Sequence, residues 1–115
     1  MNVNPERKYL AVSIKHSLPS RGYQMTRPLV LWGRRTEDDS PRRSFGGYTT
    51  DPEKAELYTI QEWIAFAGKY SDILPWQPVK CNVNLLRSNR NVDSVLVEYE
   101  DYMNYYRFVF DPERS

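Results

Sequence analysis

Cysteine and histidine are nearly absent from this chain of 115 residues, each occurring once. A single cysteine excludes an intramolecular disulfide and a cysteine-rich metal cluster, and it fits a reducing compartment. Cys81 also lies on the apolar face of an alternating segment, which indicates a small core residue rather than a nucleophile. We therefore expect no metal site and no bound cofactor.

Long apolar runs and a strong excess of one charge are also missing. No stretch approaches the roughly 18 apolar residues of a membrane helix, and residues 1–8 lack the apolar core of a signal peptide. We therefore expect a soluble cytoplasmic protein without a membrane partner. The formal net charge of +1 argues against a polybasic nucleic-acid binder and against an acidic mimic of nucleic acid.

The length fits one compact domain over residues 1–115, with 1–8 flexible. Residues 9–16 alternate between apolar and polar side chains, as in a half-buried strand. A short apolar run at 28–33 predicts a second strand, which we expect to pair with the first as a hairpin. Residues 45–49 predict a third strand.

Two helix-start patterns follow the third strand in succession. Thr50 with Glu53 fits a capping box, and the Asp-Pro pair between them offers a second cap with proline at the first helical position. Thr59 with Glu62 fits another capping box. The pattern predicts one short helical turn, a bend, and a second helix that ends near residue 69.

The rest of the chain predicts further strands. Residues 79–85 alternate with one apolar face, and residues 95–99 and 105–110 resemble a hairpin because they are rich in β-branched and aromatic side chains. A helix is the alternative, since several apolar residues between 95 and 106 share one helical face. We predict an α+β domain, an antiparallel sheet of about five strands with a short broken helix packed on one face.

One segment resembles a pattern in small uncharacterised proteins of phages and prophages. The matching residues are Gly47-Tyr48-Thr49, Ala55, Tyr58-Thr59 and Glu62, with Trp32-Gly33 upstream. The resemblance covers residues 9–63. The chain departs from the pattern by an Arg-rich insertion after Trp32 and by Glu56, which stands where glycine is common.

The resemblance implies a mobile-element origin. Small accessory proteins of such elements often bind and block host machinery, including restriction and CRISPR nucleases. We therefore expect a non-enzymatic protein that inhibits a host protein or nucleoprotein complex, with anti-CRISPR activity as the concrete version. Because the net charge is close to zero, steric blocking is favoured over mimicry of DNA.

Two groups of residues are candidates for the contact with that partner. Residues 34–44 form a polar segment without periodicity, which predicts an exposed loop, and tyrosines are concentrated near the C-terminus. Arginine and tyrosine are enriched at binding hot spots. The predicted contact residues are Arg34, Arg35, Arg42, Arg43, Tyr99, Tyr102, Tyr105 and Tyr106.

Nucleic-acid binding through the arginine-rich loop is an alternative. Arginine suits phosphate, and Trp32 and Phe45 at the base of the loop suit base stacking. The acidic residues at 37–39 offset part of this positive field.

A second alternative is an ADP-ribosyltransferase-like enzyme. His16 and Tyr48 resemble the dinucleotide-holding residues of folds of the His-Tyr-Glu type, and Glu98 or Glu100 would then polarise the ribose. This alternative needs three groups to converge in one pocket. Other enzyme signatures are missing from the sequence: there is no Gly-rich phosphate loop, no paired-His metal motif and no nucleophile elbow.

Overall fold

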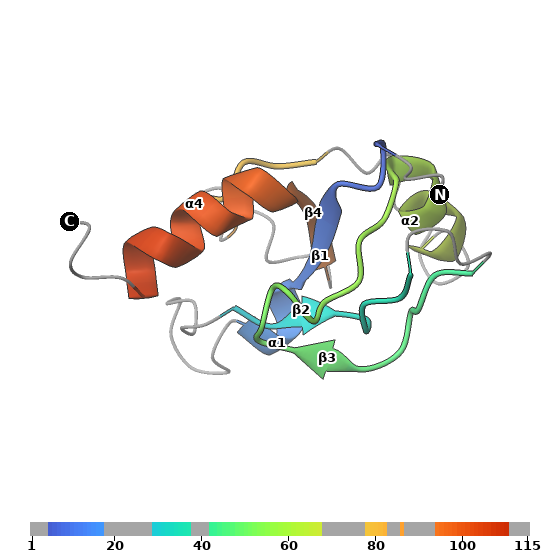
Figure 1. Ribbon diagram of the computed structural model, residues 1–115, viewed down its shortest axis with the longest axis horizontal. Coiled ribbons are helices and arrows are strands. Elements are labelled where there is room, and N and C mark those ends of the chain that lie inside the picture. Colours follow the sequence, from blue (N-terminus) through green and yellow to red (C-terminus); the bar gives the residue numbers. More distant parts are fainter. Residues whose placement is uncertain are drawn as a thin grey trace.

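The computed structural model describes residues 5–17, 29–37, 42–67, 78–82, 86 and 94–110. These residues form an α+β domain around a four-stranded antiparallel sheet with the strand order β3-β2-β1-β4 (Figure 1). The strands are β1 (Tyr9–Ser13), β2 (Leu31–Trp32), β3 (Tyr48–Thr49) and β4 (Ser94–Glu98). The helices are α1 (Ile14–Ser17), α2 (Ile60–Ala67) and α4 (Tyr99–Phe110).

The longest pairing in the sheet is the antiparallel pair of β1 and β4, which runs in register from Tyr9 opposite Glu98 to Ser13 opposite Ser94 and places β4 at one edge. The other side of β1 pairs with β2. The predicted antiparallel pairing of the first two strands is therefore confirmed. β3 pairs only with β2 and forms one edge of the sheet, with Trp32 opposite Tyr48.

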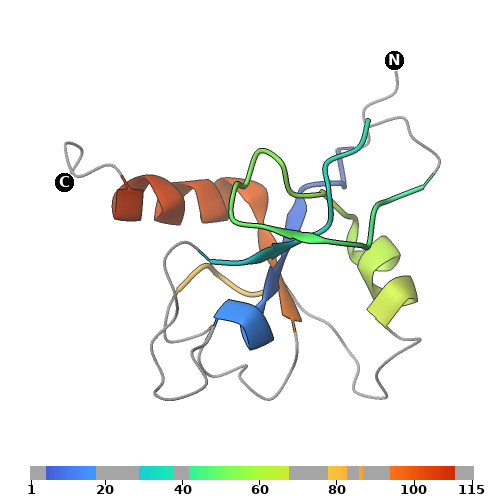
Figure 2. The same cartoon turned by 90° about the horizontal axis from the view of Figure 1, so that it is seen from below.

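Helices pack on both faces of the sheet, because side chains of successive strand residues point to opposite faces. Leu10 and Val12 belong to one core cluster together with Tyr102 of α4. Ala11, between them, belongs to a second cluster with Trp63 of α2. Figure 2 shows α4 and α2 on opposite sides of the sheet. The prediction of about five strands with a short broken helix packed on one face is confirmed only as an α+β domain, because the described residues form four strands and α4 packs on the face opposite α2.

The predicted strand at residues 105–110 is wrong, because α4 begins directly after β4 and continues to Phe110. Tyr102 and Met103 are buried and Tyr99 and Tyr106 are partly buried, at the spacing of one helical face. Glu100 and Asp101 lie in the first turn, where acidic side chains are favourable. Packing on the sheet thus outweighs the local preference of aromatic residues for strands.

The first predicted strand is shorter than expected. Residues 14–17 form the single turn of α1 instead, and the Ser13 hydroxyl accepts a hydrogen bond from the backbone N–H of His16 at 3.2 Å. This bond caps the turn and ends β1 at Ser13. In the segment that was predicted as a strand at 79–85, the described residues 78–82 are irregular, and residues 83–85 lie outside the described part.

The two predicted helix starts have different outcomes. After β3 the chain makes a turn rather than a helix, closed by the Asp51 carboxylate, which accepts from the N–H of Glu53 at 2.9 Å. The second start is a reciprocal capping box, in which Glu62 accepts from the N–H of Thr59 at 2.8 Å and Thr59 accepts from the N–H of Glu62 at 3.0 Å. Helix α2 follows; the predicted end near residue 69 lies outside the described residues.

Candidate functional site

The arginine-rich segment is held in place by one buried carboxylate, that of Glu56, which is fully buried. It accepts hydrogen bonds from the N–H and hydroxyl groups of Thr36 and from the backbone N–H groups of Ser44 and Leu57. The guanidinium of Arg43 completes the network at 3.1 Å. Because a buried charge is costly without such partners, this network determines how residues 33–37 and 42–44 lie over the turn at 51–57.

Arg43 therefore has a structural position and does not belong to an exposed contact surface. Its side chain is 2% exposed, and it also donates to the carbonyl of Glu37 at 2.7 Å. The neighbouring Arg42 is exposed. Arg42 and Arg43 were both predicted to contact a partner. Of these two arginines, only Arg42 is exposed at the surface.

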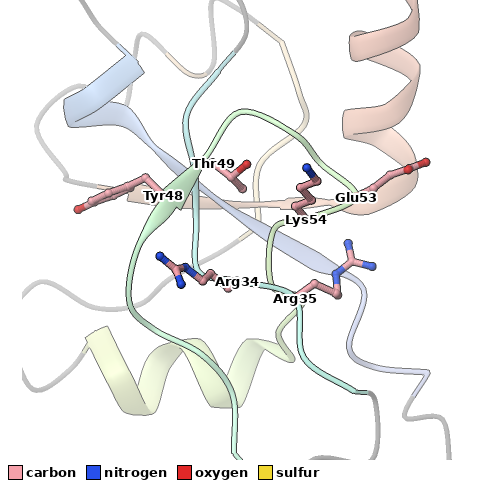
Figure 3. Close-up of a pocket in the computed structure, with 6 residues that line it drawn as sticks. All are labelled: Arg34, Arg35, Tyr48, Thr49, Glu53 and Lys54. Carbon is pink, nitrogen blue, oxygen red and sulfur yellow. The ribbon is translucent and has the colours of Figure 1, made fainter.

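The same two segments form a hollow at the β3 edge of the sheet. Gly33 and Gly47 both have φ of 84°, which favours glycine, and the N–H of Gly33 donates to the carbonyl of Gly47 at 2.8 Å. This turn geometry brings the residues that follow β2 beside β3. The hollow has a volume of about 390 Å³. It is lined by Arg34, Arg35, Tyr48, Thr49, Glu53 and Lys54 (Figure 3).

Three cations and one carboxylate give the lining a positive balance, but the cations differ in their bonding. Arg35 donates to the carbonyls of Ala55 at 2.5 Å and Pro52 at 2.9 Å, and its guanidinium lies 5.7 Å from the ring centroid of Tyr99. For Arg34 and Lys54 we find no side-chain hydrogen bond or ion pair within the described ranges. Unlike Arg35, these two cations are therefore accessible for an ionic contact at the hollow.

Tyr48 is the only exposed large hydrophobic side chain in the described part of the chain, at 47%. Its ring packs against His16 with the centroids 4.5 Å apart and against the edge of Trp32 at 5.0 Å. Trp32 in turn contacts Trp63 and Phe66 of α2. Tyr48 is thus the outer end of a row of aromatic side chains that begins in the core, and its ring packs against its neighbours at the surface.

The C-terminal tyrosines face inwards more than predicted. Tyr102 is fully buried, and burial raises the pKa of its hydroxyl above the usual range. Tyr99, Tyr105 and Tyr106 are partly buried and pack against the core cluster under α4. Tyr102 therefore leaves the predicted contact set, and the other tyrosines contribute mainly to packing of α4 on the sheet.

The three groups of the ADP-ribosyltransferase alternative do not converge. His16 follows the end of β1 at Ser13, whereas Glu98 lies opposite Tyr9 at the other end of that strand. Glu98 is also within 3.7 Å of the ammonium group of Lys8. His16 and Tyr48 are in contact, but Glu98 lies at the opposite end of β1 from His16, and Glu100 follows it in the first turn of α4.

Cys81 is consistent with the predicted role in packing. Its side chain packs against the core cluster under α4. Burial, together with the nearby carboxylate of Asp101, raises the pKa of the Cys81 thiol to about 12. A thiol with such a pKa stays protonated at neutral pH and is a poor nucleophile.

Some residues of the hollow were missed by sequence reasoning. Lys54 lies in a short turn and carries no motif of its own, and Tyr48 was considered only as part of the resemblance motif and of an enzyme site. Glu56 did give a signal, because it is a lone acid between the apolar residues Ala55 and Leu57. A charged residue in such a place predicts either a buried partner or a functional group.

Comparison with protein-family models, curated proteins and solved structures finds no match to this chain. The resemblance to phage proteins therefore stays a prediction that rests on the residues of the segment 9–63. The helices in the described ranges are all too short or too polar to cross a bilayer.

Proposed function

We propose that this protein is a non-enzymatic accessory protein of phage type that acts in the host cytoplasm, where it binds and inhibits a host protein or nucleoprotein complex. The contact would be made by the edge surface, which we define as Arg34, Tyr48 and Lys54. The observation that supports this choice is the exposed ring of Tyr48, which packs against Trp32 and lines the same hollow as Arg34, an arginine with no side-chain partner in the described ranges.

The edge surface has the properties of a binding hot spot. Tyrosine and arginine dominate measured hot spots, and tyrosine supplies contact area at a low entropic cost. Here the cost is reduced further, because Tyr48 already packs against His16 and Trp32. A preorganised side chain loses less freedom on binding, so more of the contact energy appears as affinity.

The concrete version of this function is inhibition of a defence nuclease, including a CRISPR nuclease. The formal net charge of +1 does not suit mimicry of a nucleic acid. Steric blocking of the target, or holding it in an inactive state, fits a compact domain with a small aromatic and basic contact surface.

The test is the plating efficiency of a phage that a defined restriction or CRISPR system holds back. Cells that express the wild-type protein should show restored plating, and the double variant Arg34→Ala with Tyr48→Ala should not. Lys80→Ala is the matched control, since Lys80 is exposed and lies outside the hollow. If the wild-type protein restores plating against none of the restriction and CRISPR systems of its host, the inhibitor function is contradicted.

Nucleic-acid binding by the arginine-rich segment is the second candidate. It is favoured by Arg34 and Arg35, which are exposed and line the same hollow as the aromatic ring of Tyr48. Such binding should appear as a gel shift that fades steeply as salt is added. An interaction that is insensitive to salt would speak for a protein partner instead.

A further inference from the structure

We propose that the hollow at the β3 edge is a binding site for a nucleoside phosphate, with the phosphate between Arg34 and Lys54 and the base on the ring of Tyr48. This inference goes beyond the proposed function, because such a site needs no partner protein. A free nucleotide and the end of a single nucleic-acid strand both carry a phosphate and a base, and the proposed site recognises this combination.

The phosphate half of the site follows from the charges of the lining. The guanidinium of Arg34 and the ammonium of Lys54 are exposed, and within the described residues neither has a side-chain partner. Charge-assisted hydrogen bonds from such groups to phosphate are among the strongest in proteins. Thr49 adds a donor, since its hydroxyl oxygen already accepts from the N–H of Asp51 at 3.1 Å and its hydrogen is left to donate.

The backbone supports the position of Arg34. The side chain of Arg34 lies along Gly47, where an added Cβ would come within 3.3 Å of its Nε atom. A glycine at this place therefore lets the arginine lie against the β3 turn at the mouth of the hollow. Figure 3 shows Arg34 on the same side of the hollow as Tyr48, with Lys54 and Glu53 on the other side.

The base half of the site follows from Tyr48. Its ring contacts His16 and, in a T-shaped arrangement, Trp32, while 47% of the residue remains exposed. Aromatic rings presented in this way are stacking platforms for bases of any sequence. The volume of about 390 Å³ lies within the roughly 300–1,000 Å³ of pockets that hold small ligands.

Glu53 provides an internal control within the site. It is the carboxylate of the lining and lies at the rim beside Lys54. Its negative charge opposes a phosphate, so Glu53→Gln should strengthen binding of a nucleotide. A general loss of structure would not produce a gain of affinity, and this variant therefore separates a ligand site from a folding effect.

The experiment is a calorimetric titration of the full chain with adenosine 5′-monophosphate, adenosine and inorganic phosphate. The monophosphate should bind more tightly than either part alone. Arg34→Ala and Lys54→Ala should each weaken its binding about tenfold, and Tyr48→Ala should do the same while Tyr48→Phe keeps the affinity. Arg42→Ala is the control, because it removes an exposed arginine that does not line the hollow.

Two further arms identify the source of the phosphate. A short single-stranded DNA is titrated with and without a 5′-phosphate. Stronger binding of the phosphorylated strand than of the free monophosphate indicates a strand end, and the reverse order indicates a free nucleotide; either result supports the site.

Three results would overturn the site: no binding of any of these probes, equal binding of phosphate and monophosphate, or equal losses in Arg42→Ala and Arg34→Ala. The plating assay keeps this outcome separate from the proposed function. A protein that still restores plating but binds no nucleotide would refute the site alone.

Discussion

This molecule has two charge-rich regions, and the segments 33–37 and 49–57 contribute to both. The regions differ in whether their charged side chains are paired inside the protein or exposed at its surface. In the interior, Glu56 accepts hydrogen bonds from Thr36 and Leu57 of these segments and from Arg43 and Ser44. At the surface hollow, Arg34 and Lys54 face outwards, and neither has a side-chain partner among the residues that the structure describes. The interior network determines the shape of the loop, and that shape leaves the surface charges available.

Residue type alone therefore does not separate a structural charge from a functional one. Arg42 and Arg43 are neighbours in sequence, yet Arg43 is buried against Glu56 and Arg42 is exposed. An arginine in this region is buried where an oppositely charged side chain, here Glu56, lies within hydrogen-bond distance. If this is right, changes in the interior network should cost stability, and changes in the hollow should cost binding.

The largest expected effect is that of Glu56→Ala. It leaves the guanidinium of Arg43 buried without its counter-charge, and breaking a buried pair from one side typically costs about 3–5 kcal/mol. The free energy of unfolding is measured by urea denaturation, with Glu53→Ala as the matched control. Glu53 is exposed, so its loss should change stability by less than about 0.5 kcal/mol.

If Glu56→Ala does not fold well enough to measure, Glu56→Gln keeps the shape of the side chain and removes its charge. It should be less stable than the wild type and more stable than the alanine variant. Equal stabilities of the Glu56 and Glu53 variants would contradict the interior network.

Gly33→Ala should give the next largest loss. Gly33 has φ of 84°, and an added Cβ would lie 2.7 Å from the carbonyl oxygen of Ser44 and 2.8 Å from the Cβ of Glu56. Backbone strain of this kind costs on the order of 1–3 kcal/mol, and the close approach adds to it. Gly46→Ala is the control, because an added Cβ there meets nothing within 4 Å. A thermal melt in which both variants unfold together would refute this reasoning.

A smaller effect concerns pH. Burial would raise the pKa of Glu62, but hydrogen bonds from Arg7 and from the N–H of Thr59 outweigh it and hold the pKa below its usual value of 4.5. A carboxylate with a lowered pKa stabilises the fold fully above that value, and the contribution disappears as the pH falls through the lowered pKa. The protein should therefore lose stability in acid.

The acid loss should be smaller in Glu62→Gln, which keeps the capping geometry but not the charge. Urea midpoints at neutral pH and below about pH 4 measure the difference. Glu98→Gln is the comparison, since the pair of Glu98 with Lys8 is about half exposed and longer, at 3.7 Å. An unchanged pH dependence in Glu62→Gln would assign the acid loss to other groups.

The sequence predicted those parts of the fold that short-range chemistry decides. The strand that begins at Tyr9 and the reciprocal box of Thr59 and Glu62 each need only a few neighbouring residues, and both are confirmed, although the strand ends at Ser13 and is buried on both faces. The strand predicted at 105–110 was wrong, because only the core beneath α4 favours the helical face of the tyrosines over their strand preference.

The candidate site was less predictable, since its charges are sorted by contacts between distant residues. Arg43 and Glu56 are 13 residues apart, and nothing local tells that they meet. In the same way, the exposure of Tyr48 depends on β3 being an edge strand, which sequence alternation cannot reveal. The sequence located the arginine-rich segment but did not indicate which of its arginines are buried and which are exposed.

The smallest change in the free energy of unfolding is expected for substitutions of the exposed cations that line the hollow. Arg34→Ala combined with Lys54→Ala removes two like charges that have no side-chain partner in the described ranges, so the free energy of unfolding should stay within about 0.5 kcal/mol of the wild type. Arg35→Ala should behave differently, since two hydrogen bonds to backbone carbonyls are lost and each contributes about 1 kcal/mol. A double variant less stable than Arg35→Ala would show that the exposed cations hold the fold together, and the contrast between interior and hollow would then fail.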